Sequence, residues 1–350
     1  MKYIVSICLL AIVSGGCEKS LNNVSSSQDL TASPTVTADL IPAPPYRWRD
    51  LGVPVLTQDP RNEAEMQNNI FNLNGDHYLA TGFRFRKVFK FNTASKSWDR
   101  VASMTFEPIY IDGIRLTFGS KVYRGISYED PQGFESYDPF TGVTTQLANF
   151  PGTPVDDPIC FVFGSKLYVV SGISRIGDLA LVNQYWEYNF LTNQWRNKGN
   201  SPIGVRAQGS AYVVNNKVYI GLGFTWVTIN SERTKRFYND WTQIDPVSST
   251  ANIAKAPFPG EKRRNAKGFM IGSTLHLGFG KVLTEYRYDL YKYNWSLDTW
   301  TAVASWPSVI EGIYGSAWAD DQLSMFGVGS SGYLVKGGLN EFWTFSNTGN

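Results

Sequence analysis

The sequence lacks an excess of charge of either sign, because its 32 Lys and Arg residues stand against 30 Asp and Glu residues. Proteins that bind nucleic acid rely on a clear cationic excess, so a net charge of +2 argues against such partners. Charged residues are scarce at 18%, whereas aromatic residues reach 15%. This composition excludes a disordered chain and favours a well-packed β protein.

Histidine and cysteine are also scarce, with two and three residues respectively. The sequence contains no CxxC, HExxH, GxSxG or P-loop pattern, so it gives no support to hydrolase or nucleotide-binding functions. Cys160 lies in the apolar stretch Ile159–Phe163, where we expect a small buried side chain rather than a nucleophile. We therefore expect no catalytic residue of these types, no metal and no cofactor.

The apolar run Tyr3–Val13 is too short to cross a bilayer of ~30 Å as a helix. Small residues then lead into Cys17, and this arrangement resembles the lipobox of bacterial lipoproteins, in which the cysteine is acylated. The resemblance implies a signal peptide over residues 1–16 and a lipid anchor at Cys17 in the outer membrane, facing the periplasm or the cell surface. Ser14 stands where lipoboxes most often have Leu, so cleavage without acylation is the alternative.

Residues 17–45 are rich in Ser, Thr, Asn and Pro and poor in apolar side chains. This composition is typical of a flexible tether. A coil of this length would hold the folded domain on the order of 30 Å from its anchor.

The rest of the chain, residues 46–350, repeats one pattern six times. A turn precedes an anchor position that is usually aromatic, and a Gly often follows four residues later. The six anchors are Tyr78, Tyr123, Tyr168, Tyr219, His276 and Ser324. Their spacing of 45 to 57 residues matches one propeller blade per repeat, at ~50 residues a blade.

A second feature follows three of the anchors, an aromatic residue with a Trp seven residues later. These pairs are Phe91 with Trp98, Tyr188 with Trp195, and Tyr293 with Trp300. The turn, strand and Trp units resemble kelch repeats, which implies an all-β, six-bladed kelch-type propeller over residues 46–350. The sixth repeat ends near Phe345 without a Trp strand, while Tyr46–Leu51 matches the Trp strands elsewhere. We expect this N-terminal strand to complete the last blade and remove the exposed edges of an open ring.

The segments that precede the innermost strands should share one face of the ring with the loops after the second strands. Counting back thirteen residues from the anchors gives Glu65, Tyr110, Val155, Arg206, Arg263 and Glu311. Counting back eleven gives Gln67, Asp112, Asp157, Gln208, Asn265 and Ile313. Positions seven and five back are almost all apolar, so the strands should line a hydrated mouth and pack blade on blade below it.

Arginines and carboxylates that converge on one axis can hold an anionic or polyhydroxylated ligand, because a guanidinium offers a planar fork to a carboxylate. Trp226, in the long segment Thr225–Phe237, could add a stacking surface for a sugar. The predicted ligand-binding residues are Arg206, Arg263, Glu65, Glu311, Asp112, Asp157 and Trp226. The alternative is that the arginines pair with these carboxylates and satisfy one another around a hydrated channel.

Two enzyme families share this type of scaffold. Galactose oxidase also has kelch blades, but its copper site needs two histidines, and we expect His77 and His276 to point to different sides of their blades. The stretch Asn216–Gly223 is similar to a repeat of the bacterial N-acetylneuraminate epimerase family. That resemblance covers the scaffold and carries over no catalytic residue.

We therefore expect a monomeric propeller that binds a protein or glycan ligand at the mouth. The alternative is a periplasmic sugar-processing enzyme of the mutarotase or epimerase kind, with mouth carboxylates and arginines as general acid and base. A third hypothesis is that the protein is a subunit of a larger envelope complex and binds its partners through the Thr225–Phe237 loop. That loop carries the charged run Glu232–Arg236, which is also typical of a solvated surface.

Overall fold

The computed structural model describes residues 46–52, 69–81, 87–104, 113–126, 130–174, 176, 179–248, 252–307, 323–336 and 341–346. All of these residues belong to the unit Ala43–Asn350. Every regular element within these ranges is a β-strand, as the composition predicts. The predicted signal peptide, Cys17 and the tether lie outside the described residues.

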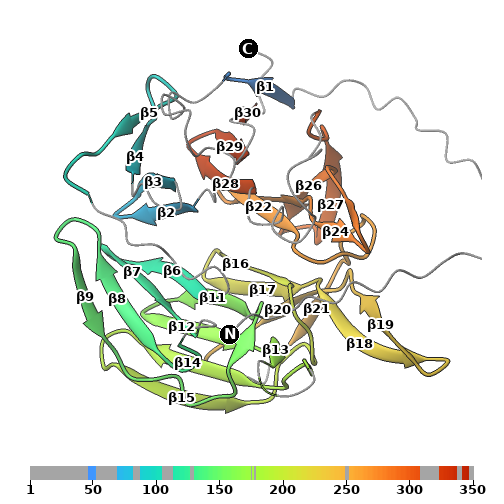
Figure 1. Cartoon of the computed structure of the whole chain (residues 1–350). Coiled ribbons are helices and arrows are strands. Elements are labelled where there is room, and N and C mark those ends of the chain that lie inside the picture. The colour runs from blue at the N-terminus through green and yellow to red at the C-terminus, as the bar shows by residue number, and fades with distance from the viewer. Residues whose placement is uncertain are drawn as a thin grey trace, which may run out of the picture. The chain divides into compact units, whose positions relative to one another are not determined.

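Six four-stranded antiparallel sheets are arranged as the blades of a β-propeller (Figure 1). The sheets, each in pairing order, are β2 (Asn69–Leu73), β3 (Asp76–Thr81), β4 (Lys87–Asn92), β5 (Ser97–Arg100); β6 (Ile114–Phe118), β7 (Lys121–Gly125), β8 (Phe134–Asp138), β9 (Val143–Gln146); β11 (Ile159–Phe163), β12 (Lys166–Val170), β14 (Tyr185–Asn189), β15 (Gln194–Gly199); β16 (Ser210–Val214), β17 (Lys217–Gly221), β20 (Trp241–Ile244), β21 (Ile253–Lys255); β22 (Lys267–Ile271), β23 (Thr274–Gly278), β26 (Leu290–Asn294), β27 (Thr299–Val303); and β28 (Leu323–Val328), β29 (Ser331–Lys336), β30 (Glu341–Ser346), β1 (Arg47–Asp50). Three two-stranded sheets are added: β10 (Val155–Asp156) with β13 (Ile173–Ser174), β18 (Phe224–Ile229) with β19 (Glu232–Phe237), and β24 (Lys281–Val282) with β25 (Glu285–Tyr286).

The N-terminal strand β1 completes the sixth blade, as the sequence predicts. It pairs antiparallel with β30, and Trp48 lies opposite Phe345. The Trp48 indole packs on Phe345 with 5.1 Å between ring centroids, and its Nε1 donates to the carbonyl of Ala304 at 2.9 Å. Because the first and last strands of the described propeller pair with each other, the edge of β30 is covered.

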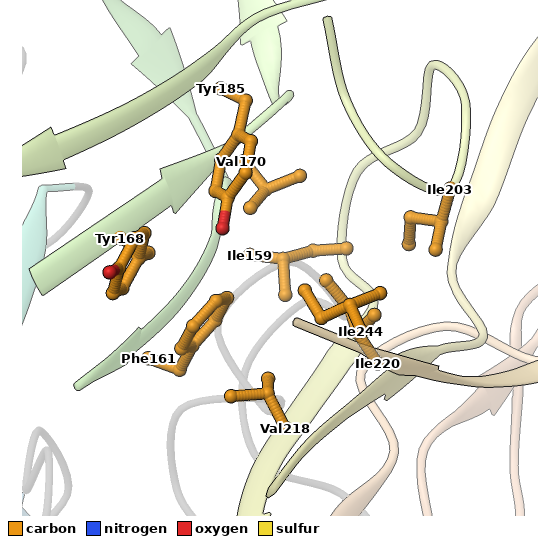
Figure 2. Close-up of a cluster of buried hydrophobic side chains, with 9 residues drawn as sticks. All are labelled: Ile159, Phe161, Tyr168, Val170, Tyr185, Ile203, Val218, Ile220 and Ile244. Atoms are coloured by element: carbon orange, nitrogen blue, oxygen red, sulfur yellow. The ribbon is translucent and has the colours of Figure 1, made fainter. Parts of the chain in front are cut away.

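The core lies between the blades, where six clusters of buried side chains fill the six interfaces between neighbouring sheets. Strand β12 shows how one strand serves two of them. Tyr168 and Val170 point toward the fourth blade, whereas Leu167 and Val169 point toward the second. Successive side chains of a strand face opposite sides of its sheet, so an apolar second strand can pack against both neighbours. Figure 2 shows the cluster between the third and fourth blades.

The anchor side chains explain the repeat. In the third blade the Tyr168 ring stacks on Phe161, directly opposite it on the innermost strand, with 4.9 Å between centroids. The pairs Phe71–Tyr78 and Phe269–His276 repeat this arrangement at 5.6 Å and 5.3 Å. An aromatic ring at the anchor therefore closes the gap to the next blade.

The two histidines lie in separate interfaces, as predicted. His77 precedes its anchor and packs on Phe326 of the sixth blade, with 4.8 Å between ring centroids. His276 is itself an anchor and contacts Phe345 at 5.4 Å. The described structure thus gives the two imidazoles different neighbours on opposite sides of the sixth blade.

The register predicted for the sixth blade is wrong. Its first and second strands are β28 and β29, and the turn between them falls at Gly329–Ser330. The anchor is therefore Tyr333, which stacks on Phe326 at 5.1 Å, and not Ser324. Asp320-Asp321 resembles the other turns in sequence, but Tyr333 supplies the aromatic ring of the second strand that packs in the interface with the first blade. Glu311 and Ile313 were counted from the wrong anchor, and both lie outside the described residues.

Candidate functional site

One face of the ring carries the segments that lead into the innermost strands of blades three to five. Each segment pairs with the loop that follows the second strand of its own blade. Val155–Asp156 pairs with Ile173–Ser174, Ala207 bridges Phe224, and Arg264 bridges Lys281. We call this region, residues 155–157, 206–208 and 263–265 with their partner hairpins, the mouth. The sequence correctly predicts that these segments and loops share one face.

Three equivalent residues tie the blades together at the mouth. Asp157, Gln208 and Asn265, each eleven residues before its anchor, have positive φ angles of 48°, 56° and 53°. The amide of Gln208 donates to the carbonyl of Asp157 at 3.1 Å, and the amide of Asn265 donates to the carbonyl of Gln208 at 2.8 Å. These backbone bonds place the three side chains in consecutive positions around the mouth.

The side chains extend this connection. Gln208 Nε2 donates to Asp157 Oδ2 at 2.8 Å, and Arg264 Nη1 donates to Gln208 Oε1 at 2.7 Å. Asp157 is exposed, and Gln208 and Arg264 are half-buried. We call Asp157, Gln208 and Arg264 the mouth chain. It presents a carboxylate, an amide and a guanidinium in one row, which suits recognition of polar or hydroxyl-rich groups.

Arg206 belongs to a mouth segment, but its side chain points into its own blade. It is 5% exposed, and its Nη1 donates to Asp240 Oδ1 at 2.7 Å and to the carbonyl of Leu222 at 3.3 Å. Its Nη2 donates to the carbonyl of Ile203, and its guanidinium lies 4.1 Å from the Tyr238 ring centroid. The side chain braces the segment before β16 against the segment before β20.

Arg263 repeats this arrangement one blade later. It is fully buried, and both terminal nitrogens donate to the Asp289 carboxylate, Nη2 to Oδ2 at 2.8 Å. Its Nη1 also donates to the carbonyl of Phe279 at 3.0 Å, and its Nε to that of Glu261 at 2.8 Å. Binding of a ligand by Arg206 and Arg263 stays a prediction, but their burial and inward partners do not favour it.

The thirteen-back and eleven-back counts assume that strand residues alternate regularly between two faces. The positive φ angles interrupt this alternation at the mouth. Positions thirteen and eleven before an anchor would share a face in a regular strand. The left-handed residues Asp157, Gln208 and Asn265 turn the chain, so the eleven-back set faces the mouth. The thirteen-back residues Val155, Arg206 and Arg263 are buried instead.

The sequence contains a pattern that indicates the burial of Arg206 and Arg263. Asp240 and Asp289 stand immediately before the third strands of the two blades that carry the arginines. In the third blade the equivalent pair is Val155 and Gln184, and Gln184 Nε2 donates to the carbonyl of Thr153 at 2.9 Å. Arginine therefore occurs with aspartate in these blades, and a comparison between repeats could have found the partner.

The structure does not describe the remaining predicted carboxylates. Glu65, Asp112 and Glu311 lie outside the described residues, so Asp157 is the predicted carboxylate that the described structure brings to the mouth. Arg264 and Lys281 were not predicted. Lys281 is 3% exposed, and its ammonium lies 4.2 Å from the Tyr286 ring centroid.

The segment Thr225–Phe237 is a β-hairpin and not an irregular loop. Strands β18 and β19 pair along their full length and extend from the fourth blade (Figure 1). The turn residues Asn230 and Ser231 have φ angles of 51° and 67°, which is typical of a type I′ hairpin turn. Arg233 and Lys235 lie 4.5 Å and 5.2 Å from the centroid of the Trp226 ring, so these cations compete with a ligand for the ring. A stacking role for Trp226 stays a prediction.

Charged pairs surround the hairpin of the fifth blade. Arg287 donates from Nη1 to Glu285 at 2.9 Å and from Nε to Glu261. The hydrogen bond from Arg287 holds the pKa of the Glu261 carboxyl below its usual value. Glu261, Glu285 and Arg287 are exposed or half-buried at the rim, where such pairs contribute little stability.

Fold and mouth together define the chain as a six-bladed β-propeller. A solved structure described as "Structure of YjhT" superposes with a TM-score of 0.53 at 17% identity, over 67% of this chain and 74% of that chain. This likeness supports the propeller fold. No family model and no curated protein matches the sequence.

Within the described ranges, no group of three or more His, Cys, Asp or Glu side chains could hold a metal ion. The described part of the chain also has no helix that is long and apolar enough to cross a membrane.

Proposed function

We propose that this protein is an envelope lipoprotein whose propeller, of the kelch repeat type, binds a protein or glycan ligand at the mouth. The mouth chain carries the proposal. Asp157, Gln208 and Arg264 come from three blades and are held in a row by direct hydrogen bonds. Such a row presents donors and acceptors in fixed positions, which lowers the ordering cost of binding a polar ligand.

The hairpins beside the mouth support the same proposal. The exposed apolar side chains Ile176, Leu179, Ile229 and Leu283 lie on the loops that follow the second strands of blades three to five. Arg233 Nη2 donates to the carbonyl of Leu179 at 2.7 Å and links two of these loops. A polar centre with apolar groups beside it is suited to specific recognition, because apolar contact adds affinity and polar contacts set orientation.

The lipid anchor at Cys17 and the tether over residues 17–45 are further parts of the proposal. They rest on the sequence pattern alone. Mass spectrometry of the N-terminal peptide of protein isolated from membranes tests them: an acylated Cys17 supports the anchor, and an unmodified N-terminus overturns it.

Thermal unfolding of residues 43–350 with a panel of sugars that includes sialic acid tests binding at the mouth. A ligand that binds only the folded state adds about 2.7 kcal/mol at about 100 times its Kd. We expect Gln208→Leu to remove the shift, because it deletes both hydrogen bonds of the mouth chain. The matched control is Gln146→Leu, an exposed amide that bonds Glu135 on the outer strands of the second blade.

The result separates binding from catalysis. A shift lost in Gln208→Leu and kept in Gln146→Leu supports a site at the mouth. Interconversion of sugar anomers by the protein that ends with Asp157→Asn would support the mutarotase or epimerase alternative. No shift with any sugar would exclude these ligands and leave a protein partner as the occupant to test.

A further inference from the structure

The face opposite the mouth carries a repeated set of exposed apolar side chains. This face, which we call the turn face, holds the turns between first and second strands and those between third and fourth strands. The third-to-fourth turns of blades two to five each expose one large apolar residue. These are Phe140, Leu191, Val247 and Leu297, with exposed fractions of 46%, 77%, 63% and 70%.

The turns do not need these side chains in order to form. Asn189 Oδ1 accepts the amide of Leu191 at 2.9 Å, and Asp245 Oδ1 accepts the amide of Val247 at 2.8 Å. Such Asx turns fix the backbone through the Asp or Asn side chain. A polar residue two positions on would serve equally well for the turn, so the exposed apolar group needs another explanation.

In two of these turns, packing between the blades does not require the exposed apolar residue either. The residue just after Asn189 is Phe190, which stacks on Phe118 of the second blade at 4.3 Å. In the fifth blade Trp295 packs in a tilted arrangement against Tyr219 of the fourth blade, with 4.5 Å between ring centroids. Leu191 and Leu297 come after these packing residues and face outward.

The arrangement of these four exposed apolar residues indicates a partner with a flat surface. Third-to-fourth turns lie toward the outside of their blades, so the exposed residues of four successive blades are spread around the ring and not gathered in one patch (Figure 1). A small ligand would reach one of these residues at most. An extended planar surface reaches all of them at once, and a lipid bilayer is such a surface.

The chain also enters the propeller on this face. Arg47 lies opposite Ser346, at the end of β30 where the other blades have their third-to-fourth turns. Arg47, Lys96 and Lys217 are exposed on the same face. Asp138 and Asp245 use their carboxylates within their own turns. Cations near a bilayer are attracted to anionic headgroups.

We propose that the turn face lies on the bilayer that carries the anchor, with Leu191, Val247 and Leu297 inserted among the lipid headgroups. The choice of bilayer rests on the proposed lipid anchor. The contact orients the propeller so that the mouth faces away from the membrane and toward its ligand. Single side chains at the interface give reversible contact, while the anchor keeps the protein at the membrane.

Vesicle flotation tests this contact without the anchor. Residues 43–350 are suitable because all described contacts close within this unit. Vesicles of phosphatidylethanolamine and phosphatidylglycerol should carry part of the protein upward. The triple variant Leu191→Ser, Val247→Ser, Leu297→Ser should reduce the partition coefficient on the order of tenfold or more, since apolar area drives insertion.

A matched triple variant on the mouth face is the control. Ile176, Ile229 and Leu283 are 67%, 54% and 64% exposed, and their replacement by Ser should leave flotation unchanged. Equal effects of the two triples, or no flotation of the parent protein, would overturn the proposal. Urea unfolding of all three proteins checks that the folds are equally stable. Because residues 43–350 do not include Cys17, failure of flotation is distinct from failure of Cys17 acylation.

Discussion

Arg263 donates hydrogen bonds from both terminal guanidinium nitrogens to the two carboxylate oxygens of Asp289. Arg206 forms a related brace one blade earlier, with a single hydrogen bond from Nη1 to Asp240 Oδ1. In both blades the arginine precedes the innermost strand and the aspartate precedes the third strand. The brace therefore fixes the two chain segments that shape the mouth, without presenting its charge to a ligand.

Removal of this brace should destabilise the fifth blade. We expect Arg263→Ala to lower the free energy of unfolding by about 3 kcal/mol, because it removes a fully buried side chain and leaves the half-buried Asp289 carboxylate without this partner. The double variant Arg263→Val, Asp289→Gln copies Val155 and Gln184 of the third blade and should recover part of the loss. Urea unfolding measures both, and a single variant as stable as the parent would contradict the brace.

Stability should fall in mild acid because of His276. Burial lowers the pKa of His276 from 6.5 to about 4. Between these values the unfolded chain binds a proton that the folded chain does not, so stability is lost as the pH falls through this window. The loss approaches about 3 kcal/mol at the lower end. Free energies of unfolding from urea titrations at a series of pH values measure it.

The variant His276→Tyr isolates this contribution. It recreates at the fifth blade the stacked pair seen in Phe161–Tyr168, so we expect the fold to be retained. The dependence of stability on pH should become shallower than in the parent. His77, whose pKa is also lowered by burial, keeps its own contribution in both proteins. Parallel pH profiles for parent and variant would contradict the assignment.

Closure of the ring depends on Trp48. The indole contacts Phe269, Phe279 and Phe345, and it donates to the carbonyl of Ala304. We expect Trp48→Ala to cost about 3 kcal/mol of unfolding free energy, a typical loss for a large aromatic side chain in a packed interface.

The exposed neighbour Arg47 supplies the control for Trp48. Arg47→Ala should change stability by less than about 0.5 kcal/mol, because an exposed surface side chain contributes little. Light scattering on warming should rise earlier in Trp48→Ala, since loss of β1 uncovers the edge of β30. Equal behaviour of the two variants would argue against closure by β1.

Cys160 should be chemically inert in the folded protein. The residue is half-buried and packs against the cluster between the second and third blades, and desolvation raises the pKa of its thiol to about 12. Alkylation by iodoacetamide at neutral pH should therefore be more than about 100-fold slower than in the same protein in urea. Peptide mass spectrometry of the Cys160 peptide follows the reaction. Comparable rates in the two states would show an accessible thiol.

The repeat could be predicted from the sequence in the blades where an aromatic anchor packs toward the next blade. Tyr78, Tyr123, Tyr168 and Tyr219 all stand on second strands and all pack toward the next blade. The sixth anchor could not be found this way, because Asp320-Asp321 imitates a turn and the true turn at Gly329–Ser330 is equally short. The strand pairing and the contact of Tyr333 with Phe91 across the closing interface, at 4.8 Å, distinguish the two registers.

The candidate site was less predictable. Gln208 and Asp157 follow from the eleven-back count, and the structure brings them into contact. Arg206 and Arg263 also fit a polar mouth in sequence, yet three left-handed residues redirect the chain and bury them. The sequence did not predict the hairpin, because Asn230-Ser231 is a weaker signal for a type I′ turn than Asn-Gly or Asp-Gly.

The sequence by itself determined the number of blades, the strand order and the closing strand, because these depend on periodic apolar and aromatic residues that act locally. Only the tertiary structure decided which polar side chains face the mouth. That choice depends on partners far along the chain, such as Asp240 for Arg206 and Asp289 for Arg263. A buried charge is placed by its partner, and a linear pattern does not show where that partner lies.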